Sequence, residues 1–269
     1  MTNRTSLLFL LPFFLILHSC DRDAANTAEE FKLVWSDEFS GDSIDTDTWV
    51  FWEGPAYNNE LQFYTSRPEN AFIRDGKLHL TAHRESYRGY DYTSARISTD
   101  STRIGWKHGR FEARIKMPAG QGFWPAFWLM PMRNDGWPRG GEIDIMEFRG
   151  NELSTTTGAV HYWMSGCEGN PVECRNYIVG EIDAETDLSS DFNLYALEWD
   201  EEGLTWYFND IEFLQVPFSD IDAEFEPFST PFYIILNLAV GGNFLPNPDE
   251  TTEFPRSLVV DYVRVYQKP

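Results

Sequence analysis

The sequence predicts an all-β protein, a sandwich or jelly roll of two packed antiparallel sheets. From residue 31 to the C-terminus, apolar and polar residues alternate in many short segments, and turn-forming residues separate these segments. No segment carries a helical pattern longer than two turns, and no repeat or linker interrupts the region. We therefore expect one domain over residues 31–269.

The strands are predicted from alternation and from the turns that end it. An Asp75-Gly76 turn signal precedes one of them, and Asn209-Asp210 is a hairpin-length break between two others. The long apolar run 232–240 suits a strand that is covered on both faces. In chain order the expected strands are 77–82, 110–117, 195–199, 204–208, 211–216, 232–240 and 258–266.

The composition limits the classes of function. The chain has 269 residues, with 21 Lys and Arg against 43 Asp and Glu, which gives a formal net charge of −22. Nucleic acid is not expected as a partner, because phosphate binding needs a basic face. Hydrophobic residues make up 42% of the chain, enough for a sizeable core, and the aromatic share of 16% is heavy for an ordinary domain.

The first 30 residues are not expected to join the domain. Arg4 precedes an apolar run over 7–17, which is too short to span a bilayer and is typical of a secretory signal. The run ends in LHSC, which resembles a bacterial lipobox, whose cysteine is lipidated after cleavage. We expect a lipoprotein signal peptide over 1–20, a lipid anchor at Cys20 and a polar tether over 21–30. A plain signal peptide with an incidental cysteine is the alternative.

The other two cysteines also favour export. Cys167 and Cys174 enclose EGNPVE, a stretch typical of a loop. A short disulfide at this loop suits an oxidising compartment, and two free thiols are the alternative. Two cysteines are too few for the usual structural zinc site. The expected location is the outer membrane or the cell surface, with membrane contact through the lipid anchor only; a periplasmic or secreted protein is the other possibility.

Acidic residues mark the most informative segment, GEIDIMEF at 141–148. In a strand Glu142 and Asp144 point to the same face, whereas Glu147 falls on the opposite one. A single β-bulge around Ile145-Met146 restores the parity and brings Glu147 beside the other two. Like charges on one face repel, so the pattern favours a functional site of coupled acids. A solvated edge strand, the alternative, does not explain the apolar residues between the acids.

Tryptophans gather just before this segment. Trp124 and Trp128 share one face of a strand by parity, and Trp137 directly precedes the acidic stretch. Some of these rings belong in the core, but sugar rings stack on aromatic faces while carboxylates act on the glycosidic bond. Paired acids beside several tryptophans in an exported acidic protein point to glycoside hydrolysis.

These residues also carry a resemblance to a known family. The segment WPRGGEIDIMEFRG resembles the signature of glycoside hydrolase family 16 in its bulged form, Glu-x-Asp-x-x-Glu, and the chain resembles the laminarinase (endo-β-1,3-glucanase) branch over nearly all of 32–268. Met146 argues against the lichenase-like branch, which lacks the bulge residue, whereas agarases and carrageenases of the family keep it. The matching stretches are VWSDEF (34–39), NNELQFYT (58–65), RPENAFIRDGKLHLTA (67–82), YTSARI (92–97), GRFEARIKMPAGQGFWPAFWLMP (109–131), ILNLAVGGNF (235–244) and VDYVRVYQ (260–267).

The resemblance implies a jelly roll whose concave sheet carries the substrate cleft. At the matching positions Glu142 is the nucleophile and Glu147 the general acid/base of retaining hydrolysis, and Asp144 helps to hold their ionisation states. The implied substrate is a laminarin-type β-1,3-glucan, cleaved internally by a monomer that needs no cofactor for catalysis. A family 16 enzyme for mixed-linkage glucan, agar or carrageenan stays open. So does a non-catalytic glycan-binding lipoprotein, although all the carboxylates are present.

The resemblance further implies a set of substrate-binding residues. For several of them an ordinary structural role is the alternative: turn residues in the 58–59 loop, a core histidine at His161, an ion-paired Arg96. The implied binding residues are Asn58, Asn59, Arg96, Trp124, Trp128, Trp137, His161 and Asn243.

A structural calcium ion, away from catalysis, is also implied. Its ligands would be the backbone carbonyls of Glu38 and Gly76 and the carboxylate of Asp261. Oxygen ligands from distant segments suit a hard cation. An ordinary solvated aspartate is the alternative at position 261.

Overall fold

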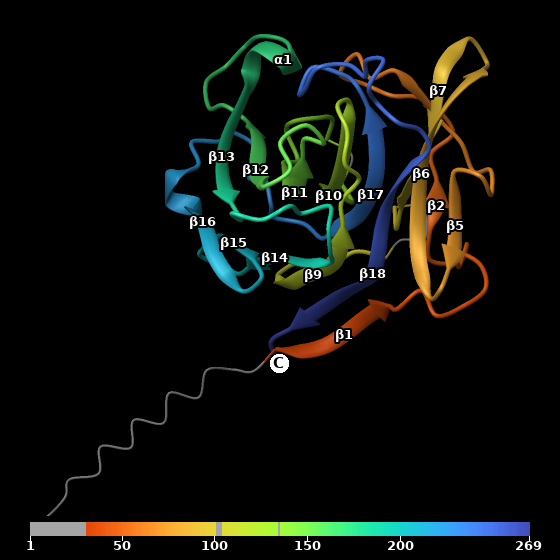
Figure 1. The fold of residues 1–269 in the computed structure, drawn as a ribbon. Coiled ribbons are helices and arrows are strands. Elements are labelled where there is room, and N and C mark those ends of the chain that lie inside the picture. Colours follow the sequence, from red (N-terminus) through yellow and green to blue (C-terminus); the bar gives the residue numbers. More distant parts are fainter. Residues whose placement is uncertain (1–30, 101–103, 134) are drawn as a thin grey trace, which may run out of the picture.

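The computed structural model describes residues 31–100, 104–133 and 135–269. The predicted signal peptide, the lipid anchor at Cys20 and the tether lie outside these residues. Nearly all of the regular secondary structure in the described residues belongs to two β-sheets (Figure 1). The described helices are α1 (Pro171–Cys174) and the 3-10 turn η1 (Phe218–Asp220). Neither of them has the length and apolar character that a membrane-crossing helix requires.

The larger sheet contains eleven strands. Its main path runs β16-β15-β14-β9-β18-β6-β7-β4-β3, while β1 pairs with β18 and β5 pairs with β6. The pairs are antiparallel except that β4 and β7 run parallel, which differs from the expected purely antiparallel sheets. In chain order its strands are β1 (Lys32–Asp37), β3 (Gly54–Pro55), β4 (Gln62–Tyr64), β5 (Ala71–Arg74), β6 (Lys77–Tyr87), β7 (Tyr90–Ser94), β9 (Gly109–Lys116), β14 (Asn193–Trp199), β15 (Gly203–Phe208), β16 (Ile211–Pro217) and β18 (Arg256–Gln267).

The smaller sheet contains seven strands in the order β13-β12-β11-β10-β17-β8-β2. Figure 1 shows β10, β11, β12 and β17 side by side in the middle of the molecule. The strands of this sheet are β2 (Val50–Phe51), β8 (Arg96–Ser98), β10 (Phe123–Pro131), β11 (Glu142–Phe148), β12 (Thr155–Trp163), β13 (Arg175–Asp183) and β17 (Phe232–Val240).

The core lies between the two sheets and follows the predicted alternation. Leu78 of β6 and Phe111 of β9 are fully buried there, and they belong to one cluster with Phe127 of β10 and Ile143 of β11. Side chains of a strand alternate between faces, so the residues between these point away from the core. All seven predicted strands are present, and β17 is covered on both faces as expected, because even the outward-facing Ile235 is buried.

One local prediction was wrong in part. The stretch between the cysteines was expected to be a loop, but its second half forms α1. The Asn170 side-chain oxygen accepts hydrogen bonds from the backbone N–H groups of Val172 and Glu173, and Pro171 occupies the first turn. These residues favour a helix start, so even one turn is stabilised. Cys167 and Cys174 form a disulfide with their Cα atoms 5.5 Å apart.

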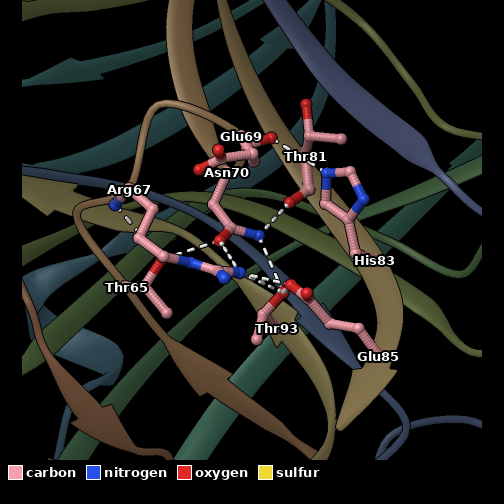
Figure 2. A network of polar contacts seen from close by, with 8 residues as sticks. All are labelled: Thr65, Arg67, Glu69, Asn70, Thr81, His83, Glu85 and Thr93. Carbon is pink, nitrogen blue, oxygen red and sulfur yellow. Dashed lines mark hydrogen bonds and ion pairs between the residues drawn. The ribbon is translucent and has the colours of Figure 1, made fainter. Parts of the chain in front are cut away.

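A buried polar network fixes the turn that follows β4 (Figure 2). Asn70 is fully buried; its side-chain oxygen accepts from Thr65 Oγ1 at 2.7 Å, and its Nδ2 donates to the backbone carbonyl of Thr81 at 3.0 Å. Arg67 forms an ion pair with Glu85 in the same network. Buried polar groups are costly unless they are paired, so this network holds β4 in one position against β6 and β7.

Candidate active site

The acidic strand carries the predicted bulge. The pairing of β11 with β12 shifts register between Asp144 and Glu147. Ile145 and Met146 therefore both enter the core, where each is at most 2% exposed. This places Glu142, Asp144 and Glu147 on the outer face of the smaller sheet, as the sequence predicted.

Burial dominates the electrostatics of these carboxyl groups. Asp144 is 4% exposed, and the Glu142 side chain is 17% exposed. Burial raises the pKa of all three carboxyl groups, in each case to about 8, because a charged carboxylate loses hydration there. The negative charge of Asp144 raises the pKa of Glu142 and of Glu147 further. The three groups therefore share protons near neutral pH, as a general acid and a nucleophile require.

His161 of β12 lies among the carboxylates. It pairs in register with Glu142, and its Nε2 lies 3.1 Å from Asp144 Oδ2 and 3.9 Å from Glu142 Oε1. Its charge, when present, lowers the pKa of both glutamates. One group in the described part of the chain could hold a metal ion, and it consists of Glu142, Asp144 and His161. Their ligand atoms lie within 4.8 Å of one another.

The three predicted tryptophans contact the site through their indole groups. Trp124 Nε1 donates to Glu147 Oε1 at 3.0 Å, and Trp137 forms a side-chain hydrogen bond with Glu142. Trp128 is opposite Asp144 in the pairing of β10 with β11. The Arg96 guanidinium lies over the Trp128 ring, with Arg96 Cζ 4.7 Å from the ring centre. Each glutamate thus has its own indole partner, and Arg96 is held by a cation–π contact.

The asparagine loops meet at one end of this face. Asn59 Nδ2 donates to Asn243 Oδ1 at 2.9 Å, and the Asn243 backbone N–H donates to the Asn58 carbonyl at 2.9 Å. A Cβ added to Gly242 would lie 3.3 Å from the Trp124 ring, so the joined loops sit beside that indole. All eight predicted binding residues therefore surround the carboxylates or border the same face.

Sequence reasoning missed the residues that support the site from below. Trp206 of β15, fully buried in the core, donates through Nε1 to the backbone carbonyl of Asp144 at 2.8 Å. Thr156 Oγ1 donates to the Glu147 carbonyl at 3.1 Å. Gly158 lies under the indole, because a Cβ at this position would be 2.4 Å from Trp206. The glycine inside an alternating strand was the available signal.

A second missed group orients Trp128. Trp128 Nε1 donates to Asn237 Oδ1 at 2.7 Å, Asn237 Nδ2 donates to the Tyr64 hydroxyl oxygen at 3.1 Å, and that hydroxyl donates to Glu60 at 3.3 Å. Asn237 and Tyr64 are buried. The signal was one polar residue, Asn237, inside the apolar run of β17.

The Asp261 carboxylate of the predicted calcium site lies on β18 of the larger sheet, where it has other partners. Asp261 Oδ2 accepts from Arg114 at 2.7 Å, and its Oδ1 lies 3.3 Å from Lys77 Nζ. Glu38 is paired with Arg264. As placed, this group does not fit calcium, because the ion would have to displace two cations from Asp261. Calcium binding stays a prediction of the resemblance, which metal analysis of the purified protein tests.

Comparison with known proteins agrees with this geometry. The model of the family described as Glycosyl hydrolases family 16 matches residues 58–264. The chain belongs to glycosyl hydrolases family 16. The earlier resemblance is thereby confirmed, and the carboxylates of β11 stand in a family of hydrolytic enzymes that act on glycosides.

Two relatives and one crystal structure of a third align with this family 16 chain over most of their length. A beta-glucanase of Rhodothermus marinus is 37% identical over 99% of this chain and 95% of its own. A glucan endo-1,3-beta-glucosidase of Cryptopygus antarcticus is 38% identical over 86% of this chain and 90% of its own. The crystal structure of the laminarinase catalytic domain of Thermotoga maritima superimposes with a TM-score of 0.79 at 37% identity, covering 90% of this chain and all of that domain.

Proposed function

We propose that this family 16 enzyme is a retaining endo-hydrolase of β-1,3-glucosidic bonds in laminarin-type β-glucans. The observation that carries the proposal is the bulged strand β11, which turns three buried carboxyl groups toward one face beside tryptophan side chains. The relatives named as beta-glucanase, glucan endo-1,3-beta-glucosidase and laminarinase supply the substrate class.

The proposed chemistry has two steps on one anomeric carbon. In the reactive form of the site, one of the protons that the carboxyl groups share is on Glu147, which donates it to the leaving oxygen as the glycosidic C–O bond breaks. The ionised Glu142 attacks the anomeric carbon and forms a covalent glycosyl-enzyme. Glu147 then takes a proton from water, whose oxygen attacks the same carbon and releases Glu142. Two inversions give net retention.

Asp144 and His161 serve this cycle as positioning residues. Their side chains lie 3.1 Å apart, and both are close enough to the two glutamates to affect the pKa of each. When the covalent bond to the sugar removes the negative charge of Glu142, the pKa of Glu147 falls. This favours deprotonation of Glu147 in the second step. The cycle needs no cofactor.

A substrate panel tests the proposal. Release of reducing ends is measured side by side on laminarin, lichenan, agarose and carrageenan, with Glu142→Gln as the inactive control. We expect laminarin to be cleaved best and to give a mixture of internal fragments, with agarose and carrageenan left intact. Agarose or carrageenan cleavage above that of laminarin would assign the enzyme to another branch of the family. Binding of laminarin without any cleavage would make it a glycan-binding protein.

We also propose that the enzyme is an exported lipoprotein anchored through Cys20. The support is the N-terminal pattern, in which Arg4 is followed by an apolar run over 7–17 and then by LHSC. Since every site residue comes from one chain, we infer that a monomer suffices. In fractionated cells Cys20→Ala should move the protein from the membrane to the soluble fraction. Cys167→Ala, which removes only the disulfide, should leave the protein in the membrane fraction. A membrane fraction unchanged by Cys20→Ala would refute the anchor.

A further inference from the structure

A short turn directly before β11 brings Trp137 to the carboxylates. The turn spans residues 136–141, and the Arg139 backbone N–H donates to the Gly136 carbonyl at 2.9 Å within it. The Trp137 side chain forms a hydrogen bond with Glu142, the first residue of β11. The position of this turn therefore determines where the indole meets the proposed nucleophile.

The side chain of Arg139 connects the turn to two aromatic rings outside it. Its Cζ lies 4.5 Å from the centre of the Trp163 ring and 5.0 Å from the centre of the Phe225 ring. These two rings, the ring pair, meet edge to face with their centres 5.9 Å apart. Arg139 is exposed, whereas Trp163 is only 4% exposed. Because a guanidinium is attracted to aromatic faces, Arg139 binds the turn to the ring pair from the solvent side.

The ring pair is itself fixed in place. Trp163 Nε1 donates to the Cys167 carbonyl at 3.1 Å, and the disulfide joins Cys167 to Cys174. Next to Phe225, the Glu224 backbone N–H donates to the Trp163 carbonyl at 3.4 Å. The ring pair is therefore tied to the disulfide loop and can serve as a fixed support for Arg139.

Other contacts of the turn lie elsewhere or are longer. A Cβ added to Gly141 would lie 2.6 Å from the buried Phe228 ring, so the β11 end of the turn packs directly on that ring. The Arg175 guanidinium is 5.9 Å from the Trp137 ring, at the outer limit of a cation–π contact. Arg139 contacts two rings at shorter distances, so it fixes the part of the turn that carries the indole.

We propose that Arg139 is a positioning residue, which holds the turn on the ring pair so that the Trp137 indole keeps its hydrogen bond to Glu142. This inference rests on the proposed function, in which Glu142 is the nucleophile. Without the guanidinium the turn would move away from the ring pair, and the indole would move with it. Glu142 would then attack the anomeric carbon from a less well-aligned position, which slows the formation of the glycosyl-enzyme.

The rate of glycosylation tests the role of Arg139. In single-turnover experiments, release of the aryl group from an activated aryl β-laminaribioside reports the step in which Glu142 forms the glycosyl-enzyme. At saturating substrate, Arg139→Ala should lower this rate constant about fivefold. Phe225→Leu, which removes one ring of the ring pair, should lower it as well. Arg74→Ala is the matched control and should leave it unchanged, because it removes an exposed guanidinium that lies 4.7 Å from the Phe72 ring on the larger sheet.

A double-mutant cycle shows whether Arg139 acts through the indole. Trp137→Phe keeps an aromatic ring but removes the N–H that bonds to Glu142. In the Trp137→Phe background, Arg139→Ala should therefore lower the glycosylation rate constant by less than about twofold. Equal losses in the two backgrounds would overturn the proposal. So would an unaltered rate constant in both Arg139→Ala and Phe225→Leu.

A readout without substrate separates this inference from the proposed function. In ¹⁵N-labelled protein, the indole N–H signal of Trp137 is the one that Trp137→Phe removes. Arg139→Ala should shift or broaden this signal, and Arg74→Ala should leave it in place. A signal that does not change in Arg139→Ala would overturn the positioning role. Absence of β-1,3-glucan cleavage by the unaltered enzyme would instead overturn the proposed function.

Discussion

At the scale of single residues, the site depends on carboxyl groups that are kept from full ionisation. Asp144 has the clearest case, because burial alone raises its pKa to about 8. A group whose folded-state pKa lies above its unfolded value of 3.8 favours the folded state in its protonated form. That contribution is complete below pH 4 and is lost as the pH rises through 8.

Replacement of Asp144 by Asn should therefore stabilise the fold at high pH. Asn carries no charge at any pH, so we expect no gain in Tm at pH 4 and a gain of at least about 2–4 °C at pH 8, the shift that 1 kcal/mol produces in a domain of this size. Activity should fall, because the proton sharing with the glutamates is disturbed. Thermal unfolding at several pH values measures the effect, with Asp91→Asn, at an exposed position, as the control. A Tm difference that does not vary with pH would contradict the account.

At the scale of elements, the bulge of β11 is held from the core side. The Trp206 indole reaches across from the larger sheet to the Asp144 carbonyl, and Gly158 of β12 leaves the space that this indole occupies. The bulge was predicted from the spacing of the acidic residues, because without it Glu147 would lie on the opposite face of the strand from Glu142 and Asp144. The sequence could not predict the indole that holds the bulge, because the choice of Trp206 depends on how two distant sheets meet.

Gly158→Ala should displace that indole. The added Cβ would lie 2.4 Å from Trp206 Cδ1 and 2.6 Å from its Nε1, far inside contact distance. Overpacking of this kind costs about 1–3 kcal/mol, so we expect a lower Tm together with a loss of kcat of at least about tenfold as the carboxylates shift. Gly41→Ala is the matched control, because its Cβ would meet nothing closer than 3.5 Å. Full activity and an unchanged Tm in Gly158→Ala would show that the indole does not hold the bulge.

At the scale of the whole molecule, the sequence predicted most of the fold and the centre of the site. Alternation is a local property, so each long strand could be assigned from its own residues, and the acids of β11 identified their own face. The distribution of strands between sheets and the parallel pairing of β4 with β7 depend on long-range contacts and were not predicted. The same limit explains why the ion pairs of Asp261 were not predicted.

The central claim is that Glu142 is the nucleophile and Glu147 the general acid/base, and azide rescue tests it most directly. With an activated aryl β-laminarioligosaccharide, azide should occupy the space left in Glu142→Ala and attack the face opposite the leaving group, giving an α-glycosyl azide. In Glu147→Ala the substrate still glycosylates Glu142, and azide attacks that intermediate without a general base, giving a β-glycosyl azide. Product anomers determined by NMR decide the matter: α from Glu142→Ala and β from Glu147→Ala support the assignment, and the reverse pattern contradicts it.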